Sequence, residues 1–132
     1  MGFLNKLFGK GAEETDWDQL LSEQAVDDVF AASATRVQLI LKHSRSCSVS
    51  FFAKQNLDSV SPEEWPEMDH SMVEVVQHRP ISQYIAAKTS VRHESPQVLV
   101  VANSEVIWHG SHSDVNKMNI QTAYEKAVQQ LA

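Results

Sequence analysis

The only cysteine of the chain, Cys47, is the residue whose type and position most clearly suggest chemistry. It follows a short apolar run, VQLIL at 37–41, which is typical of a strand buried on both faces. Apolar spacing after it predicts a helix with an inward face made by Val49, Phe52, Ala53 and Leu57. Cys47 is therefore expected at a strand-to-helix turn, where open α/β sheets place their sites.

A thiol at the start of a helix is expected to form the thiolate readily. Backbone N–H groups of the first turn, at Val49 and Ser50, are expected to point toward the sulfur, and the helix dipole adds partial positive charge. Lys42, Arg45 and a protonated His43 are expected to add further positive charge. The alternative is an inert core thiol, which is the commoner state of a free cysteine, but the polar neighbours in SRSCS favour an exposed nucleophile.

Length and composition limit the classes of protein that this chain can be. Its 132 residues suggest one domain, and 42% hydrophobic residues are enough to build a core. Eleven basic against seventeen acidic residues give a net charge of −6, which argues against a nucleic-acid-binding surface. A single cysteine excludes an internal disulfide.

The N-terminal segment differs in composition from the rest of the chain. Residues 1–10, MGFLNKLFGK, have amphipathic spacing but are too short to cross a bilayer and make a poor secretory signal. We expect a flexible arm over residues 1–14 that does not contact a membrane, followed by one domain over residues 15–132.

Hydrophobic periodicity predicts the element order β-α-β-α-β-α-β-β-α. The strands are expected at 16–20, 37–41, 71–77, 97–102 and 105–109, the last two forming an antiparallel hairpin across Asn103 and Ser104. The last helix is expected to be capped by Ser113 or Asp114. Its predicted buried stripe consists of Val115, Met118, Thr122, Ala123, Ala127 and Leu131.

Four short motifs bring a known family into view. They are KHSRSCSVS at 42–50, RPIS at 79–82, VRHESPQ at 91–97 and WHGSH at 108–112. In order and spacing they resemble the monothiol bacilliredoxin family, the YtxJ-type proteins of the bacillithiol system, over residues 16–132. Members often carry proline directly after the active-site cysteine, where this chain has Ser48.

The resemblance implies an α/β, thioredoxin-like fold with a central mixed sheet of four to five strands flanked by helices. It also implies a thiol–disulfide oxidoreductase that removes bacillithiol, or a similar small thiol, from protein mixed disulfides. Cys47 is then the nucleophile, Ser50 replaces the resolving cysteine of a C-x-x-C site, and His43 adds positive charge or transfers a proton. Pro96 matches the cis-proline position, and the expected substrate-binding residues are Ser44, Arg45, Ser95, Pro96, His93 and His112.

The same resemblance sets the expected partners. We expect thiolated client proteins and a small thiol as co-substrate, no resident cofactor, no nucleic acid, a monomer and a cytoplasmic location. The spacing of His43, Cys47, His109 and His112 permits zinc without requiring it, and we expect no metal. A thiol peroxidase, an iron–sulfur carrier of the C-x-x-S glutaredoxin type and a non-catalytic binding module are alternatives.

Overall fold

The computed structural model describes residues 17–60 and 62–132, so the predicted arm over 1–14 lies outside the described residues. Five strands form one mixed sheet in the order β1-β3-β2-β4-β5. Strands β1, β3 and β2 run parallel, whereas β4 is antiparallel to both β2 and β5. The strands are β1 (Asp18–Gln19), β2 (Val37–His43), β3 (Met68–Glu74), β4 (Gln97–Ala102) and β5 (Glu105–Ser111).

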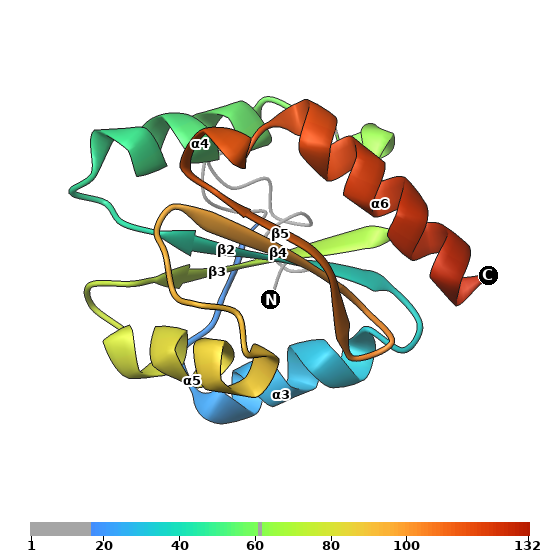
Figure 1. Ribbon diagram of the computed structural model, residues 1–132, viewed down its shortest axis with the longest axis horizontal. Coiled ribbons are helices and arrows are strands. Elements are labelled where there is room, and N and C mark those ends of the chain that lie inside the picture. The colour runs from blue at the N-terminus through green and yellow to red at the C-terminus, as the bar shows by residue number, and fades with distance from the viewer. Residues whose placement is uncertain (1–16, 61) are drawn as a thin grey trace, which may run out of the picture.

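Helices cover both faces of this sheet, α4 and α6 on one side and α3 and α5 on the other (Figure 1). The described chain therefore has the predicted α/β architecture. None of the described helices has the length and apolar character needed to cross a membrane. The helices are α3 (Glu23–Ala32), α4 (Ser48–Asp58), α5 (Arg79–Thr89) and α6 (Lys117–Leu131), with short 3-10 turns η1 (Pro62–Glu64) and η2 (His112–Asp114).

Strand β2 is the central strand, between β3 and β4, and both of its faces are covered. All seven of its residues are buried. Leu39 and Leu41 belong to the core under α4 and α6, and Ile40 belongs to the core on the opposite face. This alternation follows from the two-residue period of a strand, and it confirms the prediction of a central buried strand.

The predicted hairpin between β4 and β5 is confirmed. Asn103 and Ser104 have φ angles of 53° and 63°, as the central residues of a primed turn require. The N–H of Asn103 also donates to the carbonyl of Ser33, at 2.8 Å, which attaches the turn to the end of α3.

Strand β3 lies earlier in the sequence than predicted, at Met68–Glu74 rather than 71–77. The Glu74 carboxylate accepts the N–H groups of Val76 and Gln77, at 3.1 and 3.0 Å. These bonds satisfy the two amides locally and close a turn, so the apolar residues after Glu74 do not continue the strand.

Helix α6 begins later than predicted. Its cap is Asn116, whose side chain accepts the N–H of Asn119 at 2.9 Å, whereas Ser113 and Asp114 belong to η2. Ala123 and Ala127 are buried as predicted, whereas Met118 is 75% exposed and Thr122 is also exposed, which corrects the predicted stripe. The residues that α6 buries are Ile120, Ala123, Tyr124 and Ala127.

The predicted inward face of α4 is also corrected. Ala53 and Leu57 are buried as expected, but Val49 and Phe52 are 50% and 59% exposed, and Ser50 is fully buried in their place. The small side chains of Ser50 and Ala53 let α4 approach the sheet, and Ser50 finds polar partners beneath it. The bulky residues of the first turns are left facing solvent.

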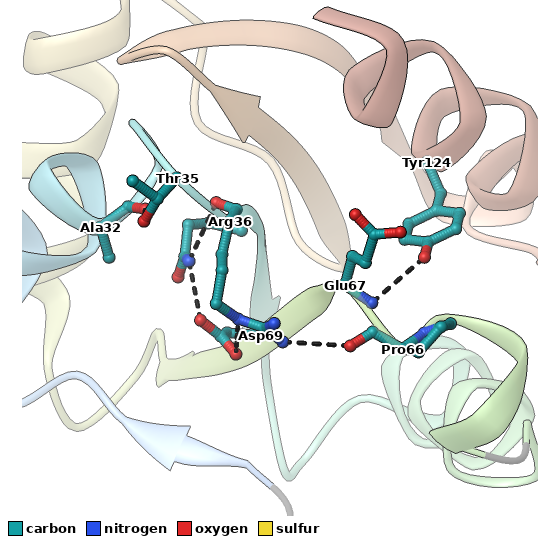
Figure 2. Close-up of polar contacts among 8 residues, drawn as sticks. Ala32, Thr35, Arg36, Pro66, Glu67, Asp69 and Tyr124 are labelled. Carbon is teal, nitrogen blue, oxygen red and sulfur yellow. Dashed lines mark hydrogen bonds and ion pairs between the residues drawn. The ribbon is translucent and has the colours of Figure 1, made fainter. Parts of the chain in front are cut away.

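Charged residues are paired at the N-terminal ends of β2 and β3 (Figure 2). Arg36 Nε lies 3.0 Å from Asp69 Oδ1, and Arg36 Nη2 donates to the Pro66 carbonyl at 3.2 Å. Asp69 Oδ2 also accepts from Gln38 Nε2 at 2.9 Å, and the Glu67 N–H donates to the Tyr124 hydroxyl. This network ties two adjacent strands and α6 together far from Cys47.

The opposite, C-terminal ends of β2 and β3 lead into loops that gather at one edge of the sheet (Figure 1). These loops are residues 44–47 and 75–78, and the 90–96 loop enters β4 at the same edge. The turn η2 packs against α4 beside them. The fold thus brings the predicted site motifs to one place.

Candidate active site

Cys47 stands where β2 gives way to α4, as predicted, and is half-buried. Its N–H donates to the Ser44 carbonyl at 3.2 Å, and its own carbonyl accepts from Phe51 at 3.0 Å, so its backbone caps the helix. The side chain makes no capping hydrogen bond, which corrects the expectation that the amides at 49 and 50 point to the sulfur. Sulfur is a weak acceptor, so only the helix dipole acts on it from this end.

A carboxylate that the sequence reasoning missed organises the Cys47 loop. Glu74, buried at the end of β3, accepts the Arg45 N–H at 2.7 Å with Oε2 while Oε1 holds the 75–78 turn. Burial alone raises the pKa of Glu74, but the N–H donors of Gln77, Arg45 and Val76 outweigh it and leave the pKa below its ordinary value. An acidic residue at the end of a buried strand is a sequence signal for such an anchor. The strand predicted at 71–77 hides this signal, because it places Glu74 in the middle of the strand.

His43 and Ser50 face each other beneath the helix start. Ser50 Oγ lies 2.8 Å from His43 Nδ1 and accepts the Ser44 N–H at 2.9 Å. Burial, followed by the charge of Lys54, lowers the pKa of His43. This environment disfavours the imidazolium form, which weakens the positive charge expected of His43. These contacts tie the buried Ser50 hydroxyl to the end of β2 and to the loop that carries Cys47.

Lys42 forms a second polar cluster on the other face of β2. It is completely buried, and its Nζ lies 3.2 Å from His93 Nδ1, which is also 2.9 Å from Ser82 Oγ. Burial lowers the pKa of Lys42 to about 8. Desolvation and then the Lys42 charge lower the pKa of His93 as well. His93 thus anchors the 90–96 loop to β2 and α5.

The 90–96 loop ends at a cis peptide bond between Ser95 and Pro96. The antiparallel register pairs Lys42 with Gln97, so Pro96 comes next toward the edge where β2 leads to Cys47. Gln97 Nε2 holds the Arg92 carbonyl at 2.9 Å, and the Pro96 carbonyl accepts the His112 N–H at 2.9 Å. Pro96 therefore lies at the predicted edge, attached to both neighbouring segments.

Two buried oxygens at this edge lack a partner among the described residues. They are Ser95 Oγ and Gln97 Oε1. Buried polar atoms in folded proteins are rarely left without a hydrogen bond. Both atoms lie beside the cis-proline, so this edge of the described fold holds buried oxygens whose hydrogen-bonding capacity is unused.

Charges of both signs lie at this edge: a hydrogen bond from Ser111, followed by nearby basic residues that include Arg92, lowers the pKa of Glu94 in the 90–96 loop. Arg45, Arg79 and Arg92 lie on or next to the surrounding loops, and none forms an ion pair within residues 17–60 and 62–132. Elsewhere, basic residues are paired in the ion pairs Arg36 with Asp69, Lys54 with Asp58, Lys88 with Asp27 and Lys117 with Glu64.

The predicted site residues do not all share one cluster. Ser44 is buried beside Cys47 and Arg45 is exposed there, whereas His93 faces Lys42 on the opposite face of the sheet. His112 opens η2, which packs against α4. In the described part of the chain, no three histidine, cysteine or acidic side chains come together as a metal site.

Comparison with known proteins decides the family. A profile described as monothiol bacilliredoxin BrxC matches residues 18–120. The chain belongs to the monothiol bacilliredoxin family. This match confirms the resemblance found from the motifs, and it spans every element from β1 to the start of α6.

Solved structures similar to this bacilliredoxin share the thioredoxin fold. One, described as a candidate oxidoreductase with a thioredoxin fold, is 31% identical with a TM-score of 0.74, and the match covers 86% of this chain and 98% of that one. Thioredoxin from Fasciola hepatica is 15% identical with a TM-score of 0.66, covering 83% and 98%. Thioredoxin from Trypanosoma brucei brucei is 10% identical with a TM-score of 0.67, covering 86% and 91%. The family and the fold support a thiol redox function.

Proposed function

We propose that this bacilliredoxin is a thiol–disulfide oxidoreductase that removes bacillithiol, or a similar small thiol, from mixed disulfides on proteins. The observation that carries the proposal is the position of its single cysteine. Cys47 is half-buried at the N-terminal cap of α4, two residues after Arg45, which forms no ion pair within the described residues. A helix N-terminus and nearby cations favour the thiolate, which is the reactive form in disulfide exchange.

The reaction needs only one protein thiol. The Cys47 thiolate attacks the small-thiol sulfur of the mixed disulfide, the bond to the client sulfur breaks, and the client leaves as a thiolate that takes up a proton. Cys47 is then joined to the small thiol. A second small-thiol molecule attacks that small-thiol sulfur, releases Cys47 and leaves as a symmetrical disulfide.

The described contacts suggest how other residues serve this reaction. Ser50 cannot form a disulfide with Cys47, and its hydroxyl is engaged with His43 and Ser44. Arg45 and His112 are proposed to contact the small thiol or its client from either side of Cys47. Ser95 and Pro96 are proposed to bind the substrate backbone at the sheet edge. The enzyme is proposed to act as a cytoplasmic monomer without a resident cofactor.

The test is turnover of a protein carrying one bacillithiol, followed by release of the client thiol. The wild type should repair the client, and Cys47→Ala should reduce the rate to the uncatalysed background. Ser113→Ala, an exposed change in η2, is the control for general effects of substitution. Repair by Cys47→Ala at the wild-type rate would contradict the proposal. Visible absorbance of a bound cluster in the purified protein would instead favour the iron–sulfur carrier.

A further inference from the structure

The proposed reaction leaves one buried cation without a role. Lys42 is 0% exposed, and within residues 17–60 and 62–132 it forms no ion pair with a carboxylate. Burying an ammonium without a counter-ion costs stability, and an apolar side chain of similar volume is often neutral or stabilising in such a place. A contribution to the stability of the core therefore does not explain a lysine at this position.

The loop that leads to Pro96 is held by side chains. Among the described residues, no backbone–backbone hydrogen bond involves residues 92–95. Gln97 Nε2 donates to the carbonyl that ends residue 92, at 2.9 Å. Lys42 Nζ reaches the next residue of the loop, at 3.2 Å from His93 Nδ1. Lys42 and Gln97 are direct partners in the register of β2 and β4, so both side chains leave the same face of the sheet and hold consecutive residues of the loop.

The partners of His93 define the state of its ring. Nδ1 contacts the Lys42 ammonium and also lies 2.9 Å from Ser82 Oγ, on a residue of α5 that is 1% exposed. The Lys42 pKa of about 8 makes the ammonium the main form at pH 7, and an ammonium can only donate. Nδ1 is therefore the acceptor, and the proton of the neutral imidazole is on Nε2. His93 itself is exposed, so its ring is fixed from inside through the Nδ1 edge.

We propose that Lys42 is a positioning residue for thiol exchange, an inference that rests on the proposed function. Its ammonium holds the His93 ring in one tautomer and one orientation, and thereby holds the 90–96 loop against β2 and α5. Pro96 follows His93 by three residues, at the edge where β2 leads to Cys47. A loop held in place meets the small thiol with little rearrangement, which is how positioning contributes to a rate.

The test compares two reactions of Cys47 in the full chain. One is exchange with the mixed disulfide of bacillithiol and free cysteine, which is proposed to bind at the loop. The other is alkylation by iodoacetamide, a small neutral reagent that needs no binding site. Lys42→Met should lower kcat/KM for exchange about tenfold, mainly through KM, and should change the alkylation rate less than about twofold. Its midpoint of denaturant unfolding at pH 7 should not fall below that of the wild type.

Two substitutions of His93 separate positioning from direct contact with the substrate. In His93→Asn, the amide oxygen can replace Nδ1 as the acceptor for Lys42, but no group reaches the position of Nε2. His93→Leu offers no acceptor at all. Exchange by His93→Asn should stay within about threefold of the wild type, and exchange by His93→Leu should fall about tenfold.

Nitrogen-15 NMR of the His93 ring gives a signature that does not depend on activity. The wild type should show the Nε2–H tautomer at pH 7, and Lys42→Met should show a mixture of the two tautomers. A wild-type ring protonated on Nδ1 would contradict the contact on which the proposal depends.

Val101→Ala is the control for a loss of stability alone. Val101 is fully buried in the core on the same face of the sheet, and it pairs with Gln38 toward the other end of β4. The cavity should lower the midpoint of unfolding. Exchange and alkylation should both stay at the wild-type rates, measured where the variant is folded.

Four results would overturn the proposal. Wild-type exchange by Lys42→Met would show that the loop does not need the ammonium. Equal losses of exchange and alkylation would place the effect of Lys42 on the thiolate. Equal losses in His93→Asn and His93→Leu would make His93 a direct substrate contact. If the wild type is alkylated and shows the Nε2–H tautomer but exchanges no bacillithiol, the proposed function itself fails, and the positioning role falls with it.

Discussion

The two ends of β2 and β3 differ in the partners of their charged side chains. At the N-terminal end, Arg36 is paired with Asp69, which also accepts from Gln38 (Figure 2). At the C-terminal end, Lys42 is buried against neutral side chains, and the Glu74 carboxylate binds backbone N–H groups. Both ends use the same strands and the same register, so the difference lies in the side chains alone.

The contrast separates stability from chemistry. Paired and hydrogen-bonded groups at the N-terminal end hold strands together and leave little charge to act on a ligand. At the C-terminal end, burial disfavours the charged form of Lys42, whereas the helix N-terminus and the arginines without ion pairs in the described chain favour a thiolate and an anionic substrate. The following predictions separate the two ends by measuring stability and thiol reactivity on the same variants.

The largest expected effect is the pH dependence of stability due to Lys42. Burial lowers its pKa from 10.5 to about 8, so the unfolded chain binds more protons between these values and wild-type stability rises as pH increases through them. The gain expected by pH 10.5 is about 3 kcal/mol, at roughly 1.4 kcal/mol per pH unit. Lys42→Met should lack this gain.

Denaturant unfolding at neutral pH and near pH 10 measures this gain in the free energy of unfolding. The wild type and Lys42→Met share every other titrating group, so their difference isolates the lysine. Parallel pH dependence in the two proteins would show that the Lys42 ammonium is not disfavoured in the folded state.

Next in size is the Glu74 carboxylate. Glu74→Ala removes the acceptor of three N–H groups and should lower the free energy of unfolding by about 2 kcal/mol. The loop that carries Cys47 loses its hydrogen bond to Glu74, so the rate of Cys47 alkylation should change about tenfold. Because the pKa of Glu74 is lowered, its contribution is present above the ordinary carboxyl pKa and is lost as pH falls through the folded value.

Glu74→Gln distinguishes charge from shape. It keeps one acceptor oxygen for the 75–78 turn but cannot accept on both sides, so its effect on alkylation should approach that of Glu74→Ala. A wild-type rate of Cys47 alkylation in both variants would show that Glu74 does not influence the thiol.

The smallest expected effect belongs to the N-terminal end of the strands. Asp69→Ala leaves the Gln38 amide and Arg36 without their shared partner and should cost about 1 kcal/mol of stability. Cys47 alkylation should stay at the wild-type rate, because no contact of Asp69 reaches the site. A change in alkylation, with little loss of stability, would break the division between the two ends.

Sequence reasoning reached the fold because its signals were local. The buried run of β2 and the two-residue hairpin at Asn103 and Ser104 follow from patterning and turn chemistry, and both are confirmed. It misplaced the start of α6 and the exposure of Val49, Phe52 and Met118, because apolar spacing does not show which turns of a helix lie over the sheet. Asn116 caps α6 by accepting the N–H of Asn119. Ser113 and Asp114 are equally favoured N-cap residue types, so the sequence alone does not choose among the three.

The site was predictable in its motifs and not in its contacts. Cys47 and Pro96 were located from short patterns that the fold brings to one edge. The Glu74 anchor and the Lys42 contact with His93 join residues 29 and 51 positions apart. Such pairings depend on strand order and register, which spacing along one chain does not define.

The most direct test of the central claim is the intact mass of the enzyme during repair of a client carrying bacillithiol. With no reducing thiol present, the account predicts one bacillithiol transferred to each chain, located on Cys47 by peptide mapping, as one client thiol is released. Release of client thiol without an adduct on Cys47, or no release at all, would contradict the assignment of Cys47 as the nucleophile.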